Sequence, residues 1–494
     1  MKPLHSIIII AAFNLSIFAQ GTKLAHKIDL KPCEIAGAEE NKKENVLCGT
    51  YEVFEDRAAK NGRKIALKIV VFPATTSDKA EDAVFYIAGG PGSSAIEEAP
   101  YAIDDFVKVR EHRDLVFVDQ RGTGGSNPLN CEFFDAADPQ SYLGHWNPLD
   151  KVRACRQQLE LKADLRLYVT TIAMDDLDEV RAALGYDKID LVAGSYGTRA
   201  SQAYIRQHGE HVRTAVLQGI SVPDQSMPRD FPEQTERALD GVIDECAADK
   251  DCHAAFPVLR TDAKALLDKL IKGPVEVEIK YPENGDKTVK VKLSRDLAAE
   301  AIRYMLYGTS SSGRIPLFLH LAAQGNFVPL AQAAVDFRKE IVGTGGTGLY
   351  LSVTCAEDLP WIAKGAGEGE RDEKTFLGTY RLRQQREACT AWPRGEVSRS
   401  YFEPVRSNVP TLLLTGQWDP VTPPMYAERL ARTFPNSRNL VIPSGGHGFG
   451  GLEGLDCITK LTTDLIVTAK TAALDVACVS GIHRKSFLLK MGEK

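Results

Sequence analysis

Short runs of apolar residues that end at glycine-rich turns recur through the first part of the chain. Residues 65–72 (IALKIVVF) alternate and are rich in β-branched side chains, residues 83–88 read AVFYIA, and residues 114–119 hold an apolar run between two aspartates (DLVFVD). Continuous apolar runs of this length are typical of strands that are buried on both faces, as in a parallel sheet covered by helices. The pattern therefore predicts three strands of such a sheet.

Helical and strand patterns then alternate along the chain. Residues 171–184 carry apolar side chains three to four positions apart, which is the spacing of one helix face. The apolar run 189–193 (IDLVA) leads into Gly-Ser-Tyr-Gly, a further helical stretch and a predicted strand at 214–217. Strand, helix and strand in alternation predict an α/β fold with a mostly parallel sheet flanked by helices.

The pattern changes after about Pro223, where helical segments dominate up to about Phe402. One predicted strand pair, at 275–281 and 287–293, interrupts the helices across a Pro-Glu-Asn-Gly turn. Buried strands resume at 409–415 and 439–442. The helices predicted for the intervening segment are 233–247, 262–271, 296–307 and 317–323.

The chain thus reads as one α/β core that is interrupted by a mainly helical segment. An insertion of about 180 residues is far longer than an ordinary loop, so we expect it to fold as a cap. The expected division is residues 20–222 for the first part of the core, 223–403 for the cap and 404–494 for the second part of the core.

The amino terminus has the features of a secretory signal peptide. Lys2 supplies the positive charge, and residues 7–19 form an apolar stretch shorter than the ~20 residues that a membrane-spanning helix needs. Ala19 is a small residue at a suitable position for cleavage. We expect residues 1–19 to be a signal peptide and the mature protein to be secreted or periplasmic; an uncleaved amino-terminal anchor is the alternative.

The chain has ten cysteines, and all of them follow the predicted signal peptide. An even number of cysteines in an exported protein indicates disulfides. Pairing between nearest neighbours is the simplest scheme, because short loops close readily. It pairs Cys33 with Cys48, Cys131 with Cys155, Cys246 with Cys252, Cys355 with Cys389, and Cys457 with Cys478.

Composition and charge exclude several classes of protein. The 494 residues are 44% hydrophobic and 26% charged, which is ordinary for a globular protein. The formal net charge of −6 argues against a basic nucleic-acid binder and against an acidic disordered chain. No paired CxxC and no HExxH motif is present, so we expect no zinc site. We also expect no other cofactor. The amino-terminal stretch is the one apolar run that approaches membrane length, so we expect no membrane span in the mature form.

Ser195 lies in Gly194-Ser195-Tyr196-Gly197, between the strand predicted at 189–193 and a helix. A serine on a sharp strand-to-helix turn exposes its Oγ at the carboxyl edge of the sheet, where the helix amino terminus offers N–H groups to a developing oxyanion. The usual motif is G-x-S-x-G, and here Ala193 stands at the first glycine. The motif alone is weak, because a serine in a glycine-rich turn is usually structural.

Two further residues strengthen the hypothesis of a nucleophilic serine. Asp419 follows the strand predicted at 409–415, and His447 follows the strand predicted at 439–442. The order Ser, Asp, His is that of the α/β-hydrolases, and all three follow strands at one sheet edge. We therefore predict that Ser195, Asp419 and His447 form a catalytic triad.

The turn Gly89-Gly90-Pro91-Gly92 follows the strand predicted at 83–88. Glycines let the backbone approach a reacting carbonyl closely, so we expect the N–H groups of Gly90 and Tyr196 to form the oxyanion hole. A phosphate-binding loop is the alternative, but the Lys-Ser/Thr of that motif is absent.

These stretches resemble the tripeptidyl aminopeptidase and prolyl aminopeptidase branch of the α/β-hydrolases, over about residues 46–480. The resemblance is carried by residues 89–92 (GGPG), 119–124 (DQRGTG), 194–198 (GSYGT), 354–360 (TCAEDLP), 389–393 (CTAWP), 412–424 (LLLTGQWDPVTPP) and 443–448 (PSGGHG). It implies the same triad, a helical cap over the site, and release of short peptides or residues from free amino termini. Ala88 departs from the family, because prolyl aminopeptidases usually have histidine there, and this puts proline specificity in doubt.

An aminopeptidase must pair the ammonium group of its substrate, and carboxylates are the physical solution. Glu357, Asp358, Glu97 and Glu98 are the candidates. We expect an exported serine hydrolase that acts as an aminopeptidase on peptides with free amino termini. An esterase or lipase-like enzyme on the same triad is the nearest alternative, because fold and triad do not specify the leaving group. A second alternative is an inactive binding protein that keeps the fold.

Overall fold

The computed structural model describes residues 28–39, 42–225, 227–285, 287–343, 345–362 and 374–492. The predicted signal peptide, residues 1–19, lies outside the described residues. At the centre is a nine-stranded sheet in the order β1-β2-β3-β5-β4-β6-β7-β10-β11. Its first strands pair antiparallel, and the strands from β5 to β11 all pair parallel, so the predicted mostly parallel α/β fold is confirmed.

The strands of this sheet are β1 (Lys31–Ala36), β2 (Lys43–Phe54), β3 (Lys64–Phe72), β4 (Ala83–Ile87), β5 (Leu115–Val118), β6 (Ile189–Gly194), β7 (Val212–Gln218), β10 (Thr411–Gly416) and β11 (Ser437–Ile442). The apolar runs found in the sequence correspond to β3 and the strands that follow it. The first two strands carry no such run, because most of their residues are exposed or half-buried, and polar side chains fill those positions.

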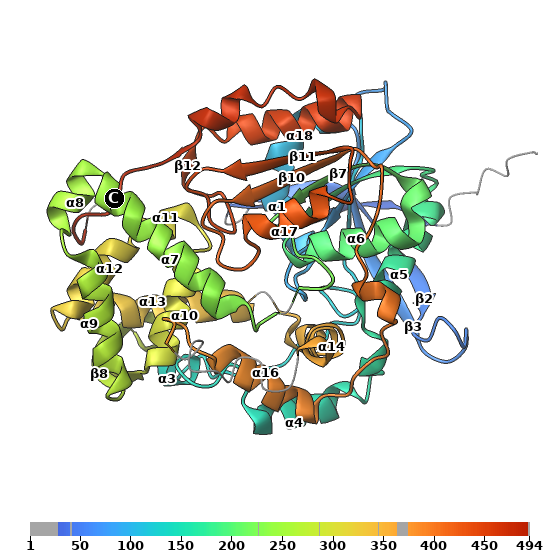
Figure 1. The fold of residues 1–494 in the computed structure, drawn as a ribbon. Coiled ribbons are helices and arrows are strands. Elements are labelled where there is room, and N and C mark those ends of the chain that lie inside the picture. The colour runs from blue at the N-terminus through green and yellow to red at the C-terminus, as the bar shows by residue number, and fades with distance from the viewer. Residues whose placement is uncertain are drawn as a thin grey trace, which may run out of the picture.

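Helices cover both faces of the sheet (Figure 1). One face packs on α1 (Ala95–Ala102), α2 (Val107–Arg110) and α18 (Asp456–Thr468). The other packs on α4 (Leu149–Leu159), α5 (Thr170–Leu184), α6 (Tyr196–His208) and α17 (Pro424–Ala431). Figure 1 shows α18 on the opposite side of β10 and β11 from α17 and α6. The buried strands are predominantly apolar because both of their faces meet helices.

The segment between β7 and β10 is mainly helical and has its own apolar core. It holds the antiparallel hairpin β8 (Val275–Tyr281) and β9 (Lys287–Leu293). Its helices include α7 (Phe231–Ala248), α8 (Lys250–Ala255), α9 (Leu259–Ile271), α10 (Arg295–Met305), α11 (Thr309–Ser312), α12 (Ile315–Ala323), α13 (Val328–Gly343), α14 (Thr347–Glu357) and α16 (Tyr380–Ala391). The short helix α3 (Pro139–Tyr142) and the carboxyl-terminal Phe487 join the same core.

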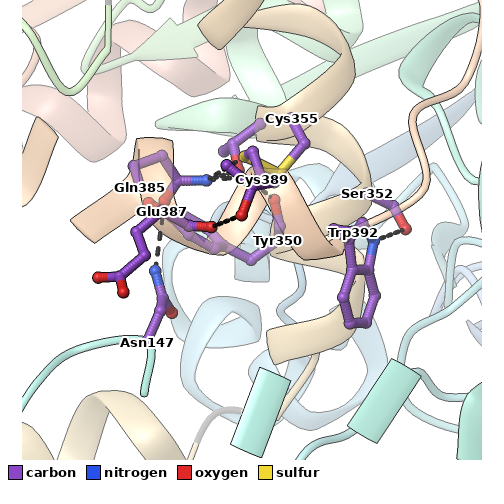
Figure 2. Close-up of a disulfide and its surroundings, with 10 residues drawn as sticks. Asn147, Tyr350, Ser352, Cys355, Gln385, Glu387, Cys389 and Trp392 are labelled. Atoms are coloured by element: carbon purple, nitrogen blue, oxygen red, sulfur yellow. Dashed lines mark hydrogen bonds between the residues drawn. A yellow bond between two sulfur atoms is a disulfide. The ribbon is translucent and has the colours of Figure 1, made fainter. Parts of the chain in front are cut away.

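The ten cysteines form five disulfides between nearest neighbours in sequence, the scheme that the sequence predicts. The disulfide Cys355–Cys389 joins α14 to α16, and Figure 2 shows the side-chain amide of Gln385 pointing toward it. The Gln385 amide donates to Thr354 Oγ1 at 2.7 Å, and the Trp392 indole donates to Ser352 Oγ at 3.0 Å. Residues of α16 and the tryptophan that follows it thus hold the carboxyl-terminal half of α14.

We predict that protein purified from an oxidising compartment will incorporate no alkylating reagent unless it is first reduced, because every cysteine is paired. Replacing both Cys355 and Cys389 by serine should lower the free energy of unfolding by about 3–4 kcal/mol, the chain-entropy value for a loop of this length. Intact-mass analysis and thermal unfolding provide the two measurements. Ten alkylated cysteines without reductant would refute the pairing.

No helix among the described residues is long and apolar enough to span a bilayer. Likewise, within the described part of the chain, no group of three or more His, Cys, Asp or Glu side chains gathers as a metal site would require.

Candidate active site

Ser195 stands at the turn between β6 and α6. Its backbone has φ of 53° and ψ of −127°, a conformation that residues other than glycine rarely adopt. The Ser195 N–H donates to Gln218 O at the end of β7, and Ser195 O accepts from Thr198 N–H and Thr198 Oγ1. These bonds on both sides of the residue maintain the strained turn and keep the side chain at the carboxyl edge of the sheet.

Two glycines allow the backbone to close around Ser195. A Cβ atom on Gly197 would lie 2.3 Å from Ile87 O, so the first turn of α6 touches the end of β4 directly. A Cβ atom on Gly89 would lie 3.3 Å from Ser195 Cβ, so the glycine-rich turn passes beside the serine. Any side chain at Gly197 would force the helix and strand apart.

Asp419 follows β10 and is fully buried. Its Oδ1 accepts from the backbone N–H groups of Val421 and Thr422, both at 2.8 Å. Its Oδ2 accepts from Thr422 Oγ1 at 2.7 Å and lies 2.8 Å from His447 Nδ1. Burial by itself would raise the pKa of the Asp419 carboxyl, but His447 and the Thr422 bonds outweigh burial and hold that pKa below its usual value.

His447 lies in the loop that follows β11, with its side chain 12% exposed. Because Nδ1 bonds Asp419, the ring presents Nε2 as its free nitrogen. The ring also lies against Gly219, where a Cβ atom would be 3.1 Å from His447 Cε1. Gly219 follows Gln218, whose carbonyl accepts the Ser195 N–H. The imidazole and Ser195 are therefore grouped at the ends of neighbouring strands β6 and β7.

One predicted oxyanion donor directly follows the serine, and the other lies in the glycine-rich turn after β4. Tyr196 is the first residue of α6, where backbone N–H groups have no partner within the helix. Gly90 has φ of 104°, and Gly92 has φ of 124°, so both need glycine. A Cβ atom on Gly92 would lie 2.8 Å from Gly346 O at the start of α14, so the inserted segment touches the glycine-rich turn directly.

Glu357, one of the predicted ammonium-binding carboxylates, is buried and has its oxygens occupied. It accepts from Thr170 N–H at 2.7 Å, Thr170 Oγ1 at 2.8 Å and Tyr401 OH at 2.6 Å. Thr170 Oγ1 lies 2.7 Å from Tyr196 OH. Glu357 is therefore linked through Thr170 to the side chain of Tyr196, whose backbone N–H is a predicted oxyanion donor.

Asp358 is paired with an arginine of the nucleophile helix. Its Oδ1 accepts from Arg199 Nη1 at 2.6 Å and Nη2 at 2.7 Å, and both side chains are only 1% exposed. Among the described residues, Asp358 Oδ2 has no hydrogen-bond partner. Burial raises the pKa of the Asp358 carboxyl to about 7, although Arg199 acts in the opposite direction.

Glu97 and Glu98 lie in the first turn of α1. Glu97 is exposed. Glu98 accepts from Tyr86 OH at 2.8 Å, and burial raises the pKa of its carboxyl. Neither carboxylate has a described contact with Ser195, Asp419 or His447.

Sequence reasoning did not find Thr422 and Tyr307. Thr422 donates to Asp419 and lies 3.0 Å from His447 Nδ1 through its Oγ1. The Tyr307 ring packs edge-on against His447 with centroids 5.0 Å apart, and its carbonyl accepts the Gly448 N–H at 2.7 Å. Thr422 is close enough in sequence to Asp419 to be suspected as a cap of its turn, whereas no local signal connects Tyr307 with His447.

Comparison with protein families agrees with this architecture. Residues 82–341 match the model of the alpha/beta hydrolase fold, and residues 374–478 match that of the TAP-like proteins.

The chain is also similar to named proteins over most of its length. It is 26% identical to the serine protease Hip1 of Mycobacterium tuberculosis over 92% of each chain. It is 25% identical to the tripeptidyl aminopeptidase of Streptomyces lividans, over 91% of this chain and 86% of that protein. Among solved structures, the proline iminopeptidase of Mycobacterium smegmatis, 13% identical, aligns over 86% of this chain and 99% of that one with a TM-score of 0.41.

Proposed function

The chain belongs to the α/β-hydrolase fold family, and we propose that it is an exported aminopeptidase that releases short peptides or residues from free amino termini. It is an enzyme of the serine hydrolase type, like the serine protease and the aminopeptidases to which it is similar. The observation that carries the proposal is the strained Ser195 turn beside the buried Asp419–His447 pair. Such a constellation suits acyl transfer through a covalent intermediate.

In the proposed mechanism, His447 Nε2 takes the proton of Ser195 as Oγ attacks the carbonyl carbon of the scissile peptide bond. Asp419 fixes the imidazole orientation and stabilises the imidazolium that forms. The N–H groups of Gly90 and Tyr196 donate to the oxyanion. The imidazolium then gives its proton to the leaving amine, and water activated by His447 hydrolyses the acyl-enzyme.

The preference for free amino termini rests on the relatives' names and on the inserted segment. Gly346 touches the glycine-rich turn, and Tyr307 touches His447, so the inserted segment borders the site from two sides. We propose that residues 223–403 act as a cap that limits the chain length accommodated on the amino side of the scissile bond. A polypeptide then enters by its free amino end.

Among the four candidate carboxylates, Asp358 fits the substrate ammonium best. Glu357 has its oxygens occupied, whereas Asp358 has a buried oxygen without a partner in the described part of the chain. A buried carboxylate of raised pKa gains from an incoming positive charge. Asp358 also contacts α6, the helix that follows Ser195, through Arg199.

Export is supported by the disulfides, which persist in oxidising compartments. With the predicted signal peptide, they suit a secreted or periplasmic enzyme.

The proposal is tested by digesting a peptide library and identifying the fragments by mass spectrometry. We expect short fragments that all begin at the substrate's own amino terminus, and labelling of Ser195 by a fluorophosphonate probe. Internal fragments would indicate an endopeptidase. Labelling of Ser195 with cleavage of esters but of no peptide would instead favour the esterase alternative.

A further inference from the structure

One face of α7 contacts the loop that carries Asp419. Arg237, Gly241 and Glu245 are spaced four residues apart, so they line one side of the helix. All three meet Trp418 or the residues beside it, although α7 precedes this loop by about 170 positions in the sequence. The inserted segment thus reaches the catalytic loops through a defined helix face.

Arg237 holds the backbone on both sides of Trp418. Its Nη1 donates to Gln417 O at 2.8 Å, and its Nη2 donates to Asp419 O at 2.7 Å. A guanidinium that bonds two nearby carbonyls restrains the peptide between them in orientation as well as in position. Burial lowers the pKa of Arg237, with Asp419 acting in the opposite direction.

Gly241 and Glu245 hold the Trp418 side chain. A Cβ atom on Gly241 would lie 2.3 Å from Trp418 Cε3, so the indole ring lies flat against bare helix backbone. The indole N–H donates to Glu245 Oε1 at 2.6 Å. Trp418 immediately precedes Asp419, so a shift of the ring moves the carboxylate.

Glu245 also bonds the loop that carries His447. Its Oε1 accepts from Ser444 Oγ at 2.7 Å, and its Oε2 accepts from Arg484 Nε at 3.0 Å. Ser444 has φ of 55°, so its backbone needs support from neighbouring contacts. One carboxylate therefore joins the loops of Asp419 and His447 to each other and to the carboxyl-terminal segment.

We propose that Glu245 and Arg237 are positioning residues that set the alignment of Asp419 with His447. The inference rests on the proposed triad. A small misplacement of a catalytic group costs much rate with little loss of binding, because the reacting atoms must meet in a narrow range of geometry. Loss of Glu245 also leaves the Trp418 N–H and the Ser444 hydroxyl without their acceptor.

The test replaces Glu245 by alanine and measures kinetics per active site, counted with the fluorophosphonate probe. We expect kcat to fall about 10- to 100-fold with KM little changed. The acid limb of the kcat/KM profile should shift to lower pH, because a displaced Asp419 stabilises the imidazolium less well. A purely structural role would lower the number of labelled sites and leave both quantities per site unchanged.

Asp244→Ala is the matched control, because Asp244 is the adjacent residue of α7, is 65% exposed and pairs with Arg260. Its kinetics should remain those of the wild type. Glu245→Gln keeps an acceptor oxygen and should restore part of the lost kcat. If Glu245→Ala does not fold, Trp418→Phe removes the indole N–H together with the five-membered ring, keeps a benzene ring beside Gly241 and should lower kcat in the same direction.

A Glu245→Ala enzyme with wild-type kcat per labelled site and an unmoved acid limb would overturn the inference. Where Trp418→Phe is used instead, an unchanged kcat per labelled site would overturn it equally. Failure of the proposed triad is a separate outcome, since the wild-type enzyme would then not be labelled at Ser195. Failure of the aminopeptidase proposal is separate again, since a labelled wild-type enzyme would then cleave esters only or release internal fragments.

Discussion

Replacing Ser195 by alanine is expected to lower kcat by about 10⁶-fold and to leave the fold intact. The hydroxyl is the proposed nucleophile, so its loss removes the atom that attacks the substrate carbonyl. Alanine keeps a Cβ atom in the strained turn, and the backbone bonds to Gln218 and Thr198 do not involve the Ser195 hydroxyl. The loss should therefore fall on chemistry rather than on stability.

Kinetics with a peptide substrate, thermal unfolding and probe labelling together measure this effect. Ser201→Ala serves as the control, because it removes a serine Oγ from α6, the helix that follows Ser195, where Ser201 Oγ donates to Gly197 O at 2.8 Å. That variant should keep its labelling and most of its activity. A Ser195→Ala enzyme with more than about a thousandth of the wild-type kcat would refute the assignment of the nucleophile.

Acetylating the amino terminus of a good peptide substrate is expected to lower kcat/KM by about 100-fold or more. Acetylation removes the positive charge and adds bulk at the closed end of the site. Losing a hydrogen bond between the ammonium and a buried carboxylate costs about 1.5–3 kcal/mol, and each decade in rate corresponds to about 1.4 kcal/mol. Matched free and acetylated peptides, assayed under the same conditions, give the ratio directly.

The ratio of kcat/KM on free and acetylated peptides, measured in carboxylate variants, identifies the carboxylate that binds the ammonium. Asp358→Asn should bring the rates for free and acetylated peptides close together, since the amide cannot pair with the charge. Glu357→Gln should instead lower both rates by the same factor, because Glu357 bonds Thr170 and Tyr401 rather than the substrate. Equal rates on the two peptides with the wild-type enzyme would contradict the aminopeptidase proposal and favour an esterase or an endopeptidase.

The inserted segment does more than border the site. The end of its α14 bonds the elements around the nucleophile, through Glu357 to Thr170 and through Asp358 to Arg199. Its α7 bonds the loops of Asp419 and His447 through Arg237 and Glu245. Contacts of this kind couple the geometry of the core to residues far away in sequence, so changes within the segment should affect catalysis as well as access.

The α/β fold and the candidate triad were readable from sequence because each depends on a local pattern. A strand buried on both faces is a nearly continuous apolar run, and a nucleophile, an acid or a histidine that follows such a strand lies at the edge where parallel strands end. Ser195 and Asp419 each follow one, whereas His447 follows β11, an edge strand whose residues are mostly half-buried or exposed, contrary to the buried strand predicted at 439–442. Disulfide pairing between neighbours was readable for a similar reason, since chain closure over short loops is favoured. Strands β1 and β2 were missed because their half-exposed residues lack the apolar run.

The state of the individual carboxylates depended on packing between distant segments. Glu357 and Asp358 are adjacent in sequence, yet both oxygens of Glu357 accept hydrogen bonds, whereas Asp358 Oδ2 has no hydrogen-bond partner among the residues that the structure describes. The four-residue spacing of Arg237, Gly241 and Glu245 is visible in the sequence, but it resembles any helix face until Trp418 is laid against it. Burial and hydrogen bonding are properties of the surroundings, which residues far along the chain provide, so no local pattern contains them.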